Sequence, residues 1–186
     1  MNLPNKITLA RIVMIPLFLA ALLSGIFSPA TARYTALAIF ITASLSDWLD
    51  GFLARRLKQI STFGKFMDPI ADKLLVASAL IALVELGSIE AWMVVVIISR
   101  EFIISGIRLI AAEQGRVIAA STWAKMKTAI QMLLIIALLF CHEAIIRDYQ
   151  ILLTVCELLK WLSVIFTVIS AYDYIYKNID IFKHKR

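Results

Sequence analysis

Four aspartates lie within a short and otherwise strongly apolar part of the chain. They are Asp47, Asp50, Asp68 and Asp72. An ionised carboxylate in or beside apolar surroundings is costly unless a positive charge compensates it. Carboxylates that converge also repel one another and tend to lose their charged forms. The cluster therefore predicts a permanent positive charge among the four side chains, most simply bound divalent metal.

The spacing of these aspartates indicates how they would bind metal. On a helix, Asp47 and Asp50 share one face, and so do Asp68 and Asp72. An all-oxygen ligand set without His or Cys selects Mg²⁺ or Mn²⁺ over zinc or copper. Four carboxylates suit two such ions about 3.5–4 Å apart, the arrangement that clamps a phosphoryl group during in-line displacement.

Small and basic residues at fixed offsets from the aspartates suit a nucleotide or phosphate ligand. Gly51 and Ala54 leave the backbone beside Asp50 open to a flat base or a phosphate. Arg55 follows one turn later and matches a phosphate oxygen in charge and geometry. Gly64 ends the basic loop that precedes the second aspartate pair.

The whole sequence predicts an all-α, polytopic membrane protein. Of its 186 residues, 61% are hydrophobic and 17% are charged, and the mean hydropathy is +0.87. This composition is typical of membrane-spanning segments, and six apolar segments reach spanning length if each takes in some polar residues. They cover residues 7–27, 34–56, 66–86, 91–112, 122–140 and 151–176. We expect them to form a single transmembrane domain over residues 1–186.

The distribution of lysine and arginine predicts the orientation of these six helices. Basic residues gather beside one set of span ends, the set that also includes both termini and all four aspartates. Beside the opposite set of ends lie only Arg33 and Arg147. By the positive-inside rule, we expect cytosolic termini and a cytosolic aspartate cluster in a multi-pass protein of the cell membrane. The net charge of +6 is spread over several loops, so we expect no nucleic-acid partner.

Two further features have a simple structural interpretation. The N-terminal segment resembles a cleavable signal peptide, but its polar pattern of Asn5, Thr8 and Arg11 favours a retained first span. The two cysteines, Cys141 and Cys156, show no paired spacing and no ligand pattern with His. We interpret them as small apolar residues of the core, not as a disulfide or a zinc site.

The string D-x2-D-G-x2-A-R-x8-G-x3-D-x3-D, from Asp47 to Asp72, resembles the signature of the CDP-alcohol phosphotransferase family. The resemblance implies the fold of that family and transfer of a phosphoryl part from a CDP-linked lipid or alcohol to a hydroxyl acceptor, with release of CMP. It implies two divalent cations as cofactors, with Asp47, Asp50 and Asp68 as ligands and Asp72 as the base that shares in metal binding. It also implies a homodimer. The implied contacts to the CDP-linked substrate are Asn5, Thr8, Gly51, Ala54, Arg55, Ser61 and Gly64.

More of the chain resembles one branch of this family, the bacterial phosphatidylglycerophosphate synthases. The shared motifs lie in residues 4–11, 68–73, 100–108 and 125–128. This branch implies CDP-diacylglycerol as the donor and glycerol 3-phosphate as the acceptor, with the lipid bilayer as the source of the donor.

The basic residues of the fourth and fifth segments favour a phosphorylated acceptor. Arg100 and Arg108 are about two helical turns apart and share one face, and Lys125 and Lys127 begin the fifth segment. Cations at the depth of a metal cluster indicate a second anionic ligand, such as the phosphate of glycerol 3-phosphate.

Several alternatives stay open from the sequence. Asp68 could simply pair with Lys73 or Arg55, Arg100 could pair with Glu101 or Asp68, and the two lysines could be topology anchors only. If the acceptor is phosphatidylglycerol, the chain is a cardiolipin synthase. Intramembrane carboxylates also occur in divalent-cation transporters, and a non-catalytic subunit would bind the CDP-lipid without turning it over.

Overall fold

The computed structural model of the chain describes residues 3–57, 62–116, 118–119, 121–141 and 150–182. Within these ranges the chain forms helices and no strand, which confirms the expected all-α class. The helices are α1 (Leu3–Leu23), α2 (Pro29–Leu57), α3 (Thr62–Glu85), α4 (Ala91–Glu113), α5 (Thr122–Phe140), α7 (Gln150–Lys177) and the short 3-10 helix η1 (Ile179–Phe182). Each of the six apolar segments of the sequence therefore corresponds to one long helix, although the first segment, residues 7–27, extends four residues beyond the end of α1.

Local signals explain where two of these helices end. Gly87 follows α3 and Gly115 follows α4, with φ angles of 64° and 70°, a region that favours glycine. At both ends, the amide that follows the glycine bonds back to a carbonyl five residues earlier, at N–O distances of 2.9 Å. These bonds satisfy carbonyls that have no partner within the helix, so both helices end in a Schellman motif.

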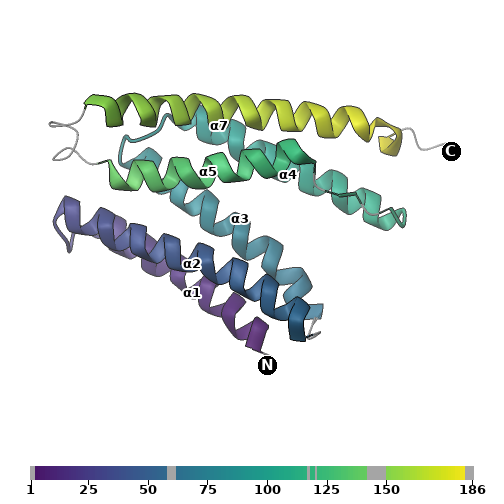
Figure 1. Ribbon diagram of the computed structural model, residues 1–186, viewed down its shortest axis with the longest axis horizontal. Coiled ribbons are helices and arrows are strands. Elements are labelled where there is room, and N and C mark those ends of the chain that lie inside the picture. Colours follow the sequence, from purple (N-terminus) through teal and green to yellow (C-terminus); the bar gives the residue numbers. More distant parts are fainter. Residues whose placement is uncertain (1–2, 58–61, 117, 120, 142–149, 183–186) are drawn as a thin grey trace.

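The helices run alternately up and down, so their connections divide between two ends of the bundle (Figure 1). At one end lie the starts of α1, α3 and α5 and the ends of α2, α4 and α7. At the opposite end lie the ends of α1, α3 and α5 and the starts of α2, α4 and α7. We call these the site end and the far end, because all four aspartates belong to the parts of α2 and α3 that meet at the first.

A continuous apolar core joins α1 to α5 and reaches α7. Phe18 of α1 and Phe40 of α2 are both fully buried, with ring centroids 6.3 Å apart, and Leu80 of α3 lies in the same cluster. Fully buried alanines such as Ala36 and Ala79 allow these helices to approach closely, as small residues do between membrane helices. A smaller separate cluster lies between α4 and α7.

Two helices among the described residues are long and apolar enough to cross a membrane, α5 and α7. A shorter apolar helical stretch covers Ile7–Leu23. Large apolar side chains are nevertheless exposed on all six long helices, for example Leu17 at 55%, Ile81 at 57% and Phe102 at 73%. Exposure of this extent is typical of a surface that contacts lipid or another protein.

Arg33 connects three parts of the bundle at the far end. Its Nη1 donates to the carbonyl oxygens of Leu138 and Cys141, at 2.8 and 3.2 Å, and its Nη2 donates to the Ser88 hydroxyl at 3.0 Å. The last carbonyls of a helix have no partner within it, and a cation there also interacts well with the helix dipole. The first turns of α2 are thereby attached to the end of α5 and to the α3–α4 connection.

We therefore expect Arg33→Met to lower the free energy of unfolding by about 2–3 kcal/mol, because part-buried carbonyls lose a charged donor. Denaturant unfolding of the purified protein in detergent measures the change. Arg33→Lys retains the charge but not the planar fork, so its loss should be intermediate. Equal stability of wild type and Arg33→Met would show that water replaces these bonds at no cost.

Candidate functional site

The structure brings the two aspartate pairs to the same end of the bundle. Asp47 and Asp50 lie in the last part of α2, and Asp68 and Asp72 lie in the first part of α3. The side chains of Asp47, Asp50 and Asp68 lie outside the described residues, whereas Asp72 is half-buried and lines a cavity. Among the described side chains, no group of three or more His, Cys, Asp or Glu comes together, so the metal site stays a prediction.

The residues expected to contact the CDP-linked substrate also belong to this end. Gly51, Ala54 and Arg55 continue α2 after Asp50, Gly64 lies in the first turn of α3, and Asn5 lies in the first turn of α1. Their side-chain surroundings, and all of Ser61, lie outside the described residues.

The first turns of α1 place two polar residues inside the bundle. Thr8 and Arg11 are both fully buried, and α1 packs against both α2 and α3. A guanidinium so far from water requires a polar or electrostatic interaction within the protein. Arg11 does take part in an interaction of this kind. Thr8 and Arg11 are therefore directed into the bundle.

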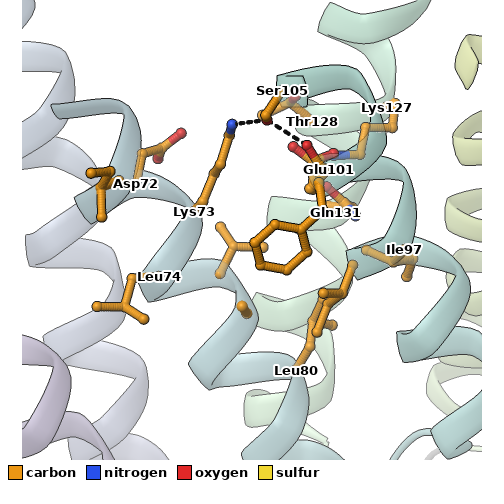
Figure 2. A pocket seen from close by; sticks show the side chains of 15 residues that line it. Asp72, Lys73, Leu74, Leu80, Ile97, Glu101, Ser105, Lys127, Thr128 and Gln131 are labelled. Carbon is orange, nitrogen blue, oxygen red and sulfur yellow. Dashed lines mark hydrogen bonds and ion pairs between the residues drawn. The ribbon is translucent and has the colours of Figure 1, made fainter. Parts of the chain in front are cut away.

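A cavity of about 420 Å³ lies between α3, α4 and α5 (Figure 2). Its polar part is formed by Asp72 and Lys73 of α3, Glu101 and Ser105 of α4, and Lys127 of α5. The remaining wall is mainly apolar, and its side chains from α3 and α4 include Leu74, Val76, Leu80, Ile97, Ile98 and Phe102. A cavity with charged groups at one part and an apolar wall elsewhere suits a ligand with both an ionic and a hydrocarbon part.

Lys73 connects α3 to α4 across this cavity. Its ammonium group donates to the Ser105 hydroxyl, which in turn donates to the backbone carbonyl of Glu101. Figure 2 shows the Lys73 side chain extending toward α4 along this chain of bonds. Asp72 and Lys73 are adjacent in sequence and line the same cavity, one with a carboxylate and the other with an ammonium group.

Glu101 joins two of the predicted acceptor-binding cations. One oxygen, Oε1, accepts from Arg100 Nη1 at 3.0 Å and also from the Lys127 ammonium group. Arg100 is 8% exposed and Lys127 only 2%, so both cations are shielded from water. The sequence suggested the Arg100–Glu101 pair as an alternative, but it gave no sign that Lys127 shares the same carboxylate.

Helix α7 supports both arginines of α4, which sequence reasoning missed. Arg100 Nε donates to Ser170 Oγ at 3.1 Å, and Arg108 Nε donates to the Tyr174 hydroxyl at 3.2 Å. The Arg108 guanidinium also lies 5.5 Å from the centroid of the Tyr174 ring, a cation–π distance. The recurrence of polar residues on one face of α7 was the available signal, since Ser170 and Tyr174 are four residues apart.

The four predicted acceptor-binding cations therefore have different surroundings. Lys127 lines the cavity, and Arg100 reaches it through their shared partner Glu101. Arg108 is held by α7, and Lys125 is exposed at the start of α5. The structure brings Arg100 and Lys127 together and places Arg108 two turns further along α4.

These side chains provide the groups that a transfer reaction on an anionic lipid requires. A half-buried carboxylate at Asp72 is suited to accept a proton, and the ammonium groups of Lys73 and Lys127 are suited to bind an anion. The apolar wall excludes water from one side of the cavity, which strengthens the electrostatic interactions inside it.

Comparison with known proteins agrees with the sequence motif. The family model described as CDP-alcohol phosphatidyltransferase matches residues 1–169. The CDP-diacylglycerol--glycerol-3-phosphate 3-phosphatidyltransferase of Bacillus subtilis (strain 168) is 44% identical over 191 residues, covering 98% of this chain and 97% of the relative.

Relatives with the same name occur in other bacteria. The protein of Pseudomonas fluorescens is 42% identical over 173 residues, covering 87% of this chain and 86% of its own length. That of Rickettsia bellii (strain RML369-C) is 35% identical over 173 residues, covering 93% of each. Because the family match and these alignments extend over most of the sequence, the chain belongs to the CDP-alcohol phosphatidyltransferase family.

Proposed function

We propose that the chain transfers the phosphatidyl group of CDP-diacylglycerol to the 1-hydroxyl of glycerol 3-phosphate. The products are phosphatidylglycerophosphate and CMP, and the reaction serves the synthesis of phosphatidylglycerol. The observation that carries this proposal is the nearly end-to-end similarity to relatives named for this activity. The cavity beside Asp72 supports it independently, because its charged part and apolar wall suit an anionic lipid reaction.

The proposed enzyme is one domain of six membrane-spanning helices with both termini and the site end in the cytosol. The alternating course of the six helices supports an even number of crossings (Figure 1). Basic residues concentrate at the site end, as the positive-inside rule requires of a cytosolic face. The donor lipid would enter sideways from the cytosolic leaflet of the cell membrane, and a homodimer remains the expected assembly.

Asp47, Asp50, Asp68 and Asp72 would hold two divalent cations, Mg²⁺ or Mn²⁺. The donor set fits, because all four are carboxylates on the adjoining ends of α2 and α3, and the described one, Asp72, is only half-buried. Cations bound there supply charge neutralisation for the diphosphate of the donor.

Asp72 is the proposed catalytic base. Its carboxylate accepts the proton of the 1-hydroxyl of glycerol 3-phosphate while the hydroxyl oxygen attacks the phosphorus attached to diacylglycerol. The bond between this phosphorus and the oxygen of CMP breaks, and CMP leaves. Reactions of this kind depend mainly on positioning and electrostatics rather than on a covalent enzyme intermediate.

Arg100, Arg108, Lys125 and Lys127 would bind the phosphate of the acceptor. Two of them already share Glu101, which keeps them oriented and limits their repulsion in the absence of acceptor. The nucleotide and diphosphate of the donor would be contacted by residues from the starts of α1 and α3, the end of α2 and the segment between α2 and α3. These residues are Asn5, Thr8, Gly51, Ala54, Arg55, Ser61 and Gly64.

We expect Asp72→Asn to lower kcat by about 10²–10⁴-fold, the usual contribution of a general base, and to spare much of the binding of CDP-diacylglycerol. Release of CMP from purified protein measures turnover, and a binding titration with the CDP-lipid measures affinity. Asp180→Asn, the same change at an exposed aspartate that pairs with Arg116 at 2.6 Å, is the matched control. Wild-type turnover by Asp72→Asn would remove the assignment of the base.

We expect removal of divalent metal with EDTA to abolish CMP release and added Mg²⁺ or Mn²⁺ to restore it. Asp50→Ala should lose metal and CDP-lipid binding together, because the donor diphosphate depends on the same positive charge. Calorimetric titration into the metal-free protein measures metal binding, and a wild-type Tm of the metal-free variant excludes a folding defect. Full activity in EDTA, or metal flux into vesicles without CMP release, would contradict the proposed chemistry.

We expect Arg108→Ala to raise the KM for glycerol 3-phosphate roughly 10- to 100-fold, as loss of a charged hydrogen bond does. The KM for CDP-diacylglycerol should change little. Arg116→Ala is the matched control, because Arg116 is another exposed arginine, follows the same helix and pairs with Asp180 away from the cavity. If glycerol 3-phosphate gives no CMP and phosphatidylglycerol does, the chain is a cardiolipin synthase instead.

A further inference from the structure

The two cysteines of the chain meet at the far end of the bundle. Cys141 follows the last residue of α5, and Cys156 lies in the second turn of α7. Their sulfur atoms are 2.8 Å apart, although the residues are 15 positions apart in sequence. The side chains are 6% and 4% exposed and belong to the main apolar core. Separate apolar fillers, as expected from the sequence, would not require this contact.

The position of the two cysteines indicates a structural role rather than a role in the reaction. Cys141 lies at the opposite end of α5 from Lys127, and its carbonyl oxygen accepts from Arg33. Helices α5 and α7 run in opposite directions (Figure 1), and the two sulfur atoms meet where α5 ends and α7 begins. A covalent bond between them would hold the end of one helix against the start of the next.

We propose that Cys141 and Cys156 form a disulfide that fixes the far end of α5 to α7. In the topology proposed above, the far end faces away from the cytosol. Disulfides persist on that side of the membrane, because it is the oxidising side. This inference rests on that orientation but not on the identity of the substrates.

The chemistry is thiol–disulfide exchange with an external disulfide, either a protein oxidant or a small-molecule one. The thiolate of one cysteine attacks the external disulfide, forms a mixed disulfide and displaces the first thiol of the oxidant. The second cysteine then attacks its partner's sulfur and displaces the other thiol. Two cysteine thiols are oxidised, one external disulfide is reduced to two thiols, and the protons pass to the departing thiolates.

Burial determines when this exchange takes place. An external disulfide has little access to either sulfur once α7 has docked, so oxidation precedes docking or requires α7 to open. The same burial protects the finished bond from reductants. We therefore expect it to persist in the folded protein and to yield to reductant only slowly.

The first test is the oxidation state of the full chain in intact cells. Cells are quenched with acid, and the protein is denatured, treated with a maleimide without reductant and digested for mass spectrometry. The expected result is a linked peptide that contains both cysteines, with no maleimide at either position. Reduction before the maleimide should convert this peptide to two labelled ones. Maleimide on both cysteines without prior reduction would overturn the proposal.

The second test measures what the bond does to the folded protein. Closing a loop of this length restricts the unfolded chain, so prolonged treatment with dithiothreitol should lower Tm by roughly 5 °C or more. Cys156→Ser should start from the lower Tm and show no further response to reductant, and so should Cys141→Ser. An equal Tm of wild type with and without reductant, after mass spectrometry has verified reduction, would mean that the pair contributes packing only.

Release of CMP at 25 °C separates this inference from the proposed function. Reduced and oxidised protein should give the same rate, because the cysteines lie at the other end of the bundle from Asp72. A linked pair in a protein that releases no CMP would support the disulfide and contradict the proposed enzyme.

Discussion

A charged side chain inside a bundle of apolar helices is stable only where opposite charge or hydrogen bonds replace the water that it has lost. Glu101 meets this requirement by accepting from Arg100 and Lys127 on one oxygen. At the far end of the bundle, Lys160 is 7% exposed and pairs with two carboxylates. Its Nζ lies 2.7 Å from Oε1 of Glu157 and 3.7 Å from Oε1 of Glu90. Because several of these partners come from different helices, pairing the charges also fixes how the helices sit together.

This constraint gives α7 a part in the site although it carries none of the predicted site residues. Ser163, Thr167, Ser170 and Tyr174 are all buried and recur at intervals of three or four residues, so they form one face of the helix. Ser170 and Tyr174 hold the side chains of Arg100 and Arg108, which stand on α4. The electrostatic field at the site end therefore depends on the packing of α7 as well as on the charges themselves.

The sequence predicted the helices well because each long helix contains a long apolar segment, which the sequence displays directly. The fifth segment, residues 122–140, coincides with α5, and the fourth differs from α4 by one residue. The second and third began too late, since Pro29 is well suited to the first turn of a helix and the polar residues from Thr62 continue α3 beyond its apolar part.

Contacts between side chains of different helices could not be predicted from the sequence. Lys127 and Glu101 are 26 positions apart, and Arg108 and Tyr174 are 66 apart, so no local period relates them. Cys141 and Cys156 match no motif because their contact arises only from the reversal of the chain between α5 and α7. By contrast, the grouping of all four aspartates on the adjoining ends of α2 and α3 follows from local spacing and a short connection, which a sequence displays directly.

The empty site and the loaded site pose opposite electrostatic problems, and Glu101 bears on both. Without an anionic acceptor, Arg100 and Lys127 are nearly buried like charges that would repel each other and lack water. The carboxylate between them offsets part of this positive charge, which stabilises the cluster and leaves it attractive to an anion. A phosphate that enters the proposed acceptor site would meet cations whose positions Ser170 and Glu101 have already restricted, so less side-chain entropy would be lost on binding. In a reaction that depends on the placement of its reactants, this preorganisation would explain why a carboxylate lies among residues proposed to bind an anion.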